Sequence, residues 1–339
     1  MTVAPAHVGP EERTEVLPAA RPDGGSPRPP RPPRSRRPER EPRPPRPPRR
    51  PPRTFAPLSP RQRAVRTVSM LVAVVSLAFV FFLVILSSVQ HAATQQQLSD
   101  AFRAQLAEGT APVSEGDFEG NLLADGAPVA MIEIPAIGVR EVVVEGTSAS
   151  ELALGPGHRR DTILPGQQGT SVIYGRAAAY GGPFARLQQL AIDSEIVVTT
   201  GQGEHTYRVM GIRYAGESTP PPIGSDEGRL VLVSARGLPY VPTGAVFVDA
   251  ELTSEVEDRG ARFTTYATVP PSAKPFASDT STVWALVFAL QFLVLAEILL
   301  LWLMPRLDSR RAWIVFFPPM LLGGIWAAYQ LTLLLPNLL

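Results

Sequence analysis

The sequence predicts a small, mainly β domain held at a membrane by three transmembrane helices and preceded by a disordered segment. Short β-branched or alternating runs recur across residues 127–255 with turn residues between them, a pattern typical of a small barrel or sandwich. Three apolar runs of about 20 residues flank that region, and this is the length a helix needs to cross a bilayer. The opening segment alternates prolines with arginines.

Residues 1–66 form the predicted cytoplasmic tail. Their apolar surface is too small to offset the entropy of ordering, so we expect disorder with polyproline II character. One interpretation is a functional tail that binds anionic membrane lipid or a proline-recognising partner. The other is a solvated tail of biased composition that only reinforces membrane topology.

The predicted spans are residues 67–89, 283–304 and 313–335. A buried core helix is the alternative for the second and third runs, but neither has the polar stripe of an amphipathic helix. The first run is longer than a signal-peptide core, and no convincing cleavage site closes it, so we expect an anchor.

Arginine placement predicts the orientation of the spans. Basic residues stand directly before the first span and within the connection 305–312, and such clusters favour the cytoplasmic side: Arg61, Arg63, Arg66, Arg306, Arg310 and Arg311. The amino-terminal end is then cytoplasmic, and residues 90–282 are extracytoplasmic. This exported part is net acidic.

Two connecting segments join the β region to the spans. Residues 90–126 are polar and include a helical pattern near 95–106, which predicts an extracytoplasmic stalk that continues the first span. Residues 256–282 contain several prolines and read as a linker back to the second span.

The β region itself, residues 127–255, contains seven or eight expected strands. It is long enough to bury a core without disulfides. The recognisable strand runs are 130–134, 141–145, 170–174, 194–200, 205–212, 229–233 and 245–250.

Composition excludes several classes of function. The chain has no cysteine, which excludes disulfides, thiolate metal sites and cysteine nucleophiles, and we expect neither metal nor cofactor. No basic face of the kind that binds nucleic acid is evident. Lys274 is the only lysine among 32 basic residues, which indicates a GC-rich, actinobacterial-type source.

A series of motifs then carries a family resemblance. Ile-Pro-Ala-Ile-Gly-Val at 134–139 is followed by Gly-Pro-Gly-His at 155–158, Leu-Pro-Gly-Gln-Gln-Gly at 164–169 and Tyr-Gly-Gly-Pro-Phe at 180–184. In order and spacing this series resembles a sortase domain, closest to the class E type of actinobacteria. The resemblance implies a sortase-like β-barrel of about seven to eight strands.

The same resemblance locates three catalytic positions, and each holds an unsuitable residue. Arg176 stands where the family has its histidine, Ala235 stands where it has the nucleophilic cysteine, and Ala245 replaces the oxyanion-binding arginine. A methyl group cannot attack a carbonyl carbon, and losing an oxyanion donor alone costs about two to three powers of ten in rate. An arginine cannot exchange protons near neutral pH.

An enzyme with a different nucleophile is the alternative. Ser234 adjoins the lost cysteine, and His158 or His205 is a candidate base. Neighbouring side chains of a strand point to opposite faces, however, so Ser234 should not take over the position of Ala235.

The former active site retains groups that suit a ligand. Two arginines would bind a carboxylate or phosphate, and two tyrosines would stack on the ligand: Tyr174, Arg176, Arg236 and Tyr240. The alternative is that the arginines pair with acids such as Asp226 or Glu227.

Polar residues inside the second span predict helix contacts. Gln291 and Glu297 stand among apolar neighbours, and a carboxylate is costly to expose to lipid, so we expect Glu297 to be protonated, paired or facing another helix. That helix would belong to this chain or to a partner. The pair Gly323 and Gly324 permits close helix packing in the third span.

These observations favour a membrane-anchored sortase-like protein without catalytic residues. The expected role is a scaffold, ligand-binding or regulatory component in cell-envelope protein anchoring or assembly. Expected partners are membrane lipid, an envelope or membrane protein and a sorting-signal-like peptide. The alternatives are a transpeptidase or hydrolase with a non-cysteine nucleophile, and a structural module that only positions the membrane helices.

Overall fold

A computed structural model describes residues 59–117, 119–224, 226–303, 306 and 309–339. These residues belong to one compact unit, Leu58–Leu339. The expected disordered tail therefore lies outside the described residues, except for its last part. The side chains of Arg63, Arg310 and Arg311 are also outside the description.

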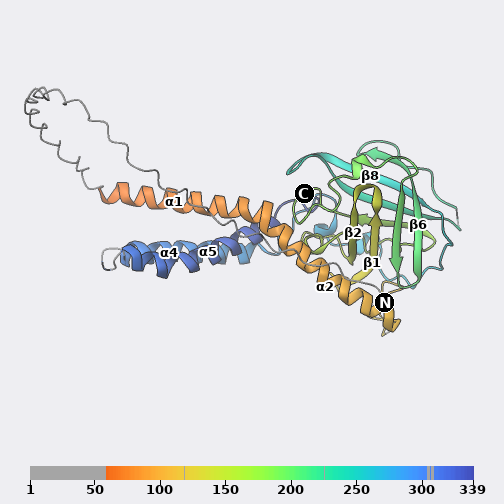
Figure 1. Ribbon diagram of the computed structural model, residues 1–339, viewed down its shortest axis with the longest axis horizontal. Coiled ribbons are helices and arrows are strands. Elements are labelled where there is room, and N and C mark those ends of the chain that lie inside the picture. Colours follow the sequence, from red (N-terminus) through yellow and green to blue (C-terminus); the bar gives the residue numbers. More distant parts are fainter. Residues whose placement is uncertain (1–58, 118, 225, 304–305, 307–308) are drawn as a thin grey trace, which may run out of the picture. The chain divides into compact units, whose positions relative to one another are not determined.

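The β region forms a closed barrel of eight strands (Figure 1), as the sequence predicts. The order around the barrel is β1-β2-β3-β4-β7-β8-β6-β5. The strands are β1 Pro128–Ile134, β2 Val139–Glu145, β3 Gly157–His158, β4 Gly169–Tyr174, β5 Glu195–Thr200, β6 Gly203–Tyr214, β7 Gly228–Leu238 and β8 Val241–Leu252.

Alternating side chains fill the barrel interior. Ile132, Ile173 and Val248 come from three different strands, and each is completely buried in the main core cluster. The two-residue β3 has no alternating pattern and was not predicted as a strand. It closes the barrel by pairing with β2 on one side and β4 on the other.

The first span and the predicted stalk are one continuous helical segment. α1 (Pro60–Phe81) passes through a π-helical turn, Phe82–Leu86, into α2 (Ser87–Glu108). Ser59 begins α1 with a capping box, because its hydroxyl accepts from the backbone of Gln62 while the Gln62 side chain accepts from the backbone of Ser59. At the π turn the Ser87 hydroxyl donates to the Leu83 carbonyl, 2.7 Å away.

α2 packs directly on the barrel. The Gln95 side chain accepts from the Val142 amide at 2.7 Å and donates to the Val142 carbonyl at 3.1 Å. Both backbone groups of this β2 residue are thus bonded to one side chain of α2. Gln95 also donates to the Leu154 carbonyl at 2.9 Å. His91 Nε2 lies 3.0 Å from Glu141 Oε2. The helical part of the predicted stalk therefore packs against the barrel.

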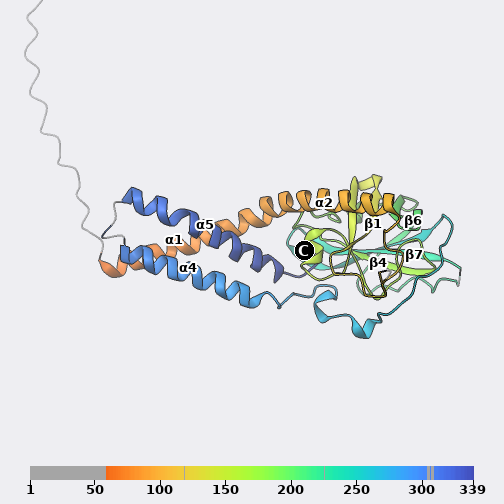
Figure 2. The same ribbon diagram turned by 90° about the horizontal axis from the view of Figure 1, so that it is seen from below.

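The second and third spans are α4 (Val283–Leu303) and α5 (Ser309–Leu333), which lie beside α1 (Figure 2). All three helices are long and apolar enough to cross a membrane. A Cβ atom on Gly323 would meet the Phe292 ring at 2.8 Å, so this glycine permits the close contact between α4 and α5.

The predicted linker to α4 lies against the segment that follows α2. Phe263 and Thr264 donate their backbone amides to Glu115 Oε2 at 2.9 and 2.8 Å. Two short 3₁₀ turns follow, Tyr266–Thr268 and Pro271–Ala273. After the second turn, the backbone carbonyls of Lys274 and Ala277 accept hydrogen bonds from Asn337, in the segment after α5.

Candidate functional site

The three positions that the resemblance marks as catalytic lie together at one end of β4, β7 and β8. Ala235 and Ala245 face each other as partners across the β7–β8 ladder. β4 runs parallel to β7, with its last residue, Tyr174, opposite Val233, and Arg176 follows the end of β4 by two residues. Both alanines are buried, at 7% and 6% exposure.

Arg176 is completely buried, and each of its three guanidinium nitrogens donates a hydrogen bond. Nε donates to the Leu152 carbonyl at 3.1 Å, Nη2 to the Ala149 carbonyl at 2.8 Å and Nη1 to the Leu339 oxygen at 3.0 Å. The Tyr180 ring lies 5.0 Å from the guanidinium carbon, in cation–π geometry. Burial lowers the pKa of Arg176 to about 10, which still leaves it cationic at neutral pH.

Ser234 is oriented away from any role as a nucleophile. Its side chain is completely buried, and its hydroxyl donates to the Gly175 carbonyl at 2.8 Å. A serine that donates its proton to a carbonyl oxygen has no base to activate it.

The two candidate bases lie in structural positions. His158 has no exposed surface, and its ring nitrogens lie 2.9 Å from Glu145 Oε2 and 2.8 Å from the Ile163 carbonyl oxygen. His205 Nε2 lies 3.1 Å from the Thr200 hydroxyl, and burial lowers the pKa of His205. Neither histidine has a hydrogen bond to Ser234 among the described residues.

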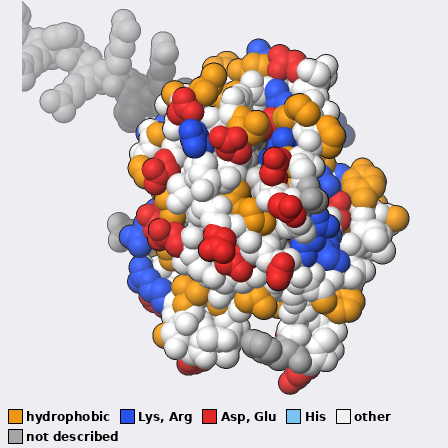
Figure 3. Space-filling model, turned by 90° about the vertical axis from the view of Figure 1, so that its right-hand side faces the viewer, with side chains coloured by type: hydrophobic (Ala, Val, Ile, Leu, Met, Phe, Trp, Pro, Cys, Tyr) orange, Lys and Arg blue, Asp and Glu red, His pale blue; other side chains and the backbone are white. Residues whose placement is uncertain are grey.

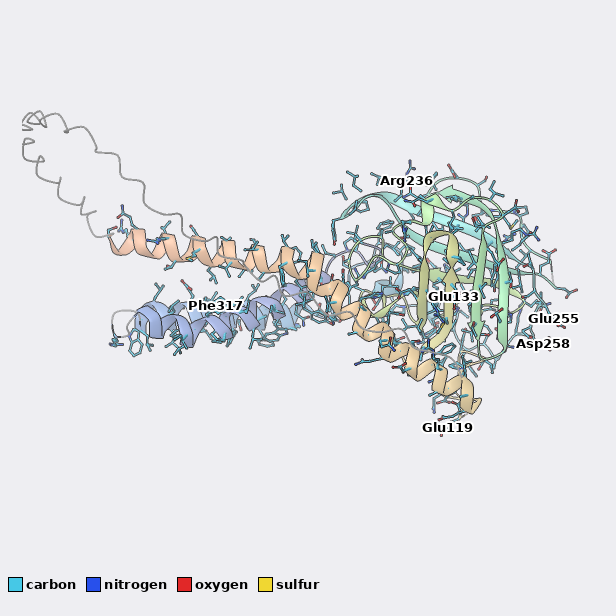
Figure 4. All side chains as sticks on the ribbon, viewed as in Figure 1. Glu119, Glu133, Arg236, Glu255, Asp258 and Phe317 are labelled. Atoms are coloured by element: carbon cyan, nitrogen blue, oxygen red, sulfur yellow. The ribbon has the colours of Figure 1, made fainter. Side chains whose placement is uncertain are left out.

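The four predicted ligand-binding residues divide into two pairs. Tyr174 ends β4, Arg176 follows it at a position that the resemblance marks as catalytic, and Tyr174 is only 2% exposed. Arg236 is exposed at the barrel edge (Figure 4), with its guanidinium carbon 4.1 Å from the Tyr214 ring. Tyr240 donates its hydroxyl to the Leu83 carbonyl of the π turn at 3.2 Å.

Neither arginine forms the ion pair that was the alternative expectation. No salt bridge found among the described residues joins Arg176 or Arg236 to Asp226 or Glu227. The carboxylate of Asp226 accepts from Gln168 instead.

The two polar residues of the second span differ in surroundings. Glu297 is 7% exposed and lines an apolar cavity of about 240 Å³ between the spans, together with Thr67 of α1. It therefore faces another helix of this chain. Gln291 lies on the exposed side of α4.

The sequence reasoning missed the segment that follows α5. Residues 335–339 read Leu-Pro-Asn-Leu-Leu, and the last three of these residues are at most 6% exposed. Leu338 and Leu339 belong to the same buried cluster as Ala235, and the Ala177 amide donates to the Leu338 oxygen at 2.9 Å. No motif in the sequence links these residues to the barrel.

The face of the molecule in Figure 3 carries many acidic side chains, in keeping with the net acidic composition expected for the exported part. Among the residues that the structure describes, no group of three or more His, Cys, Asp or Glu side chains could hold a metal ion.

Comparisons with known proteins bear on the barrel. Residues 132–239 match the family model of the sortase domain. Sortase D of Bacillus subtilis is 31% identical over 85 residues, which cover 25% of this chain and 41% of that protein. The chain thus spans about two fifths of the length of this curated relative.

Solved sortases give weaker likenesses. A sortase D5 transpeptidase of Clostridium perfringens has a TM-score of 0.40 at 21% identity, covering 48% of this chain and 99% of that one. The SrtF sortase of Corynebacterium diphtheriae has a TM-score of 0.35 at 22% identity, covering 44% and 93%. The family match spans Arg176 and Ala235 and most of the barrel strands, so this chain carries a sortase-family domain.

Proposed function

We propose that this protein is a non-catalytic sortase-family component of the cell envelope, which binds an extended peptide where catalytic members have their active site. The observation that carries the proposal is the pairing of Ala235 with Ala245 beside the buried Arg176. These residues provide no nucleophile and no proton-transfer group. The hydroxyl of Ser234, the residue before Ala235, donates to the backbone carbonyl of Gly175.

The membrane helices support a place at the cell surface. Three helices able to span a membrane, with arginines before the first and between the other two, favour an extracytoplasmic barrel and a cytoplasmic amino-terminal end. In this arrangement the former active site meets exported polypeptides. The proposed ligand is a sorting-signal-like peptide, and the proposed partner is an envelope or membrane protein.

A cleavage assay tests the lack of catalysis. The full chain in lipid nanodiscs would be incubated with a panel of Leu-Pro-x-Thr-Gly peptides, and mass spectrometry would follow both peptide and protein. We expect neither cleavage nor a covalent acyl adduct. Cleavage that disappears in Ser234→Ala would contradict the proposal and establish an enzyme with a serine nucleophile.

Crosslinking in cells tests the scaffold role. The intact protein would be purified after mild crosslinking, and we expect an envelope or membrane protein to be linked to barrel residues. Repeated recovery of the protein alone would exclude a scaffold role. The deletion of the barrel should also disrupt the crosslinked complex, which separates this role from a module that only positions the helices.

A further inference from the structure

The segment after α5 returns to the barrel and fills the space beside Ala235. α5 ends at Leu333, and residues 335–339 follow within a few residues of that end. In Figures 1 and 2 the end of the chain lies against the barrel. A membrane helix thus delivers a short peptide directly to the position where the resemblance places the nucleophile.

Apolar contacts hold the two leucines of this segment. Leu338 is completely buried and Leu339 is 6% exposed. Both pack in one cluster with buried side chains of α3 (Glu151–Leu154), β4 and β7, which we call the leucine seat: Leu152, Val172, Tyr174, Val231, Val233 and Ala235. Burying apolar side chains is favourable, so we expect the seat to provide much of the affinity for this segment.

Hydrogen bonds hold the side chain and the backbone of Asn337. The Asn337 side-chain nitrogen donates to the Thr147 carbonyl at 2.7 Å and to the Lys274 carbonyl at 2.9 Å. The Asn337 backbone amide donates to the Ala277 carbonyl at 3.0 Å. Both acceptors of the side chain are carbonyl oxygens, so the site requires a donor at this position and disfavours a carboxylate.

Arg176 completes the contact. Nε and Nη2 of its guanidinium donate to the carbonyls of Leu152 and Ala149 within the barrel domain, and Nη1 donates to the Leu339 oxygen. The side chain that replaces the family's histidine is therefore the group that joins the segment to the barrel. A lysine has a single nitrogen and cannot hold three oxygens in this planar arrangement.

We propose that residues 335–339 are the built-in ligand of the former active site, and that this segment must leave before a peptide from another protein can bind. The inference rests on the peptide-binding function proposed above, and it names the regulation of the same site. A ligand tethered this closely has an effective concentration of about millimolar, so free peptide would compete poorly with the seated segment.

Cysteine crosslinking tests the seating of the segment. Because the chain has no cysteine, the double variant Ala177→Cys/Leu338→Cys introduces the only two thiols. These residues share a backbone hydrogen bond, and Cα atoms about 4.4–6.8 Å apart are within disulfide range. We expect the full chain in nanodiscs to form this disulfide under mild oxidation, measured by mass spectrometry.

The control pair is Ala177→Cys/Leu322→Cys, which places the second thiol on an exposed position of α5, about 16 Å before the end of that helix at Leu333. It should not crosslink. Addition of Asn337→Asp to the first pair should lower the crosslinking rate about tenfold, because two buried carbonyls lose their donor. Arg176→Lys should lower it as well and serves as a second variant. Crosslinking no faster than in the control pair would overturn the inference.

A peptide-binding measurement tests whether residues 335–339 prevent other peptides from binding. A fluorescent copy of residues 334–339, Leu-Leu-Pro-Asn-Leu-Leu, would be titrated into the intact chain, into Asn337→Asp and into the crosslinked form. We expect binding at least about tenfold tighter to Asn337→Asp than to the intact chain, and none to the crosslinked form. A peptide copy with aspartate in place of asparagine is the matched control and should bind weakly throughout.

The outcomes separate the two proposals. Equal peptide binding by the intact and Asn337→Asp chains would overturn the self-occlusion and leave peptide binding as the function. Efficient crosslinking without peptide binding by any form would overturn the proposed function instead, together with the exclusion that rests on it.

Discussion

At the residue scale, the described contacts give structural partners to three polar residues that the sequence made candidates for chemistry or ligand binding. Ser234, His158 and Arg176 are all buried, and each forms hydrogen bonds to backbone carbonyl oxygens. Such groups stabilise the fold, since a buried polar group without a partner costs about 1–3 kcal/mol. The chemistry that the sequence suggested for Ser234 would require this bonding to be broken.

Replacing Ser234 tests that assignment. Ser234→Ala removes one buried hydrogen bond to the Gly175 carbonyl, so we expect a loss of about 1 kcal/mol in unfolding free energy. Thermal unfolding in nanodiscs measures this change. Unchanged stability would show that the bond contributes nothing and would reopen a functional role for the hydroxyl.

His205 predicts an acid-sensitive component of stability. Burial lowers its pKa below the unfolded value of about 6.5, so at lower pH the unfolded chain binds more protons than the folded one. Stability contributed by the neutral imidazole is thus present above about pH 6.5 and is lost as pH falls towards the folded pKa. Melting temperatures at pH 7.5 and pH 5 should differ more in the natural chain than in His205→Gln. Equal differences would contradict the prediction.

At the scale of elements, α2 is joined to β2 through the side chain of Gln95. Sequence periodicity predicts that this segment is helical, and the helix does extend to Glu108. The docking itself depends on residues 47 and 59 positions away, Val142 and Leu154, which a local pattern cannot indicate. Gly155 is required as well, because a Cβ atom there would overlap the Gln95 amide.

An isosteric change at Gln95 measures this docking. Gln95→Glu would direct a carboxylate at the carbonyls of Val142 and Leu154, and we expect a loss of about 1–3 kcal/mol near neutral pH. The loss should shrink towards pH 4, where a protonated glutamate again donates. The neighbouring Gln96 is exposed and bonds only Asp100 among the described residues, so Gln96→Glu is the matched control and should change stability by less than about 0.5 kcal/mol. Equal effects of both changes would exclude a specific role for Gln95.

At the scale of the whole molecule, the membrane helices and the barrel are linked by several contacts within one compact unit. The hydroxyl of Tyr180, in the barrel domain, lies 2.9 Å from the hydroxyl of Thr332 in α5. The Tyr180 ring packs edge-on against Phe82 of the π turn. Tyr240 reaches the π turn from the β7–β8 hairpin. The spans therefore contact the barrel beside Arg176, where the segment after α5 enters.

Single cysteines test the expected membrane orientation. Ile192 is 67% exposed on the barrel, and Arg306 lies in the connection between α4 and α5. In intact cells a membrane-impermeant maleimide should label Ile192→Cys, whereas Arg306→Cys should react only after permeabilisation. The natural chain has no thiol and provides the blank. The reverse labelling pattern would invert the predicted topology.

The sequence by itself determined the elements of this protein: the β-strand runs, the three apolar helices, and the family motifs that locate Arg176 and Ala235. These follow from local periodicity and composition, because a strand or a membrane span requires a particular spacing of apolar side chains. Only the tertiary structure decided what surrounds those positions. Arg176 bonds an oxygen 163 residues away, and Leu338 enters a cluster built from three distant segments. Such pairings depend on chain reversal and shape complementarity, and no local pattern in residues 335–339 encodes them.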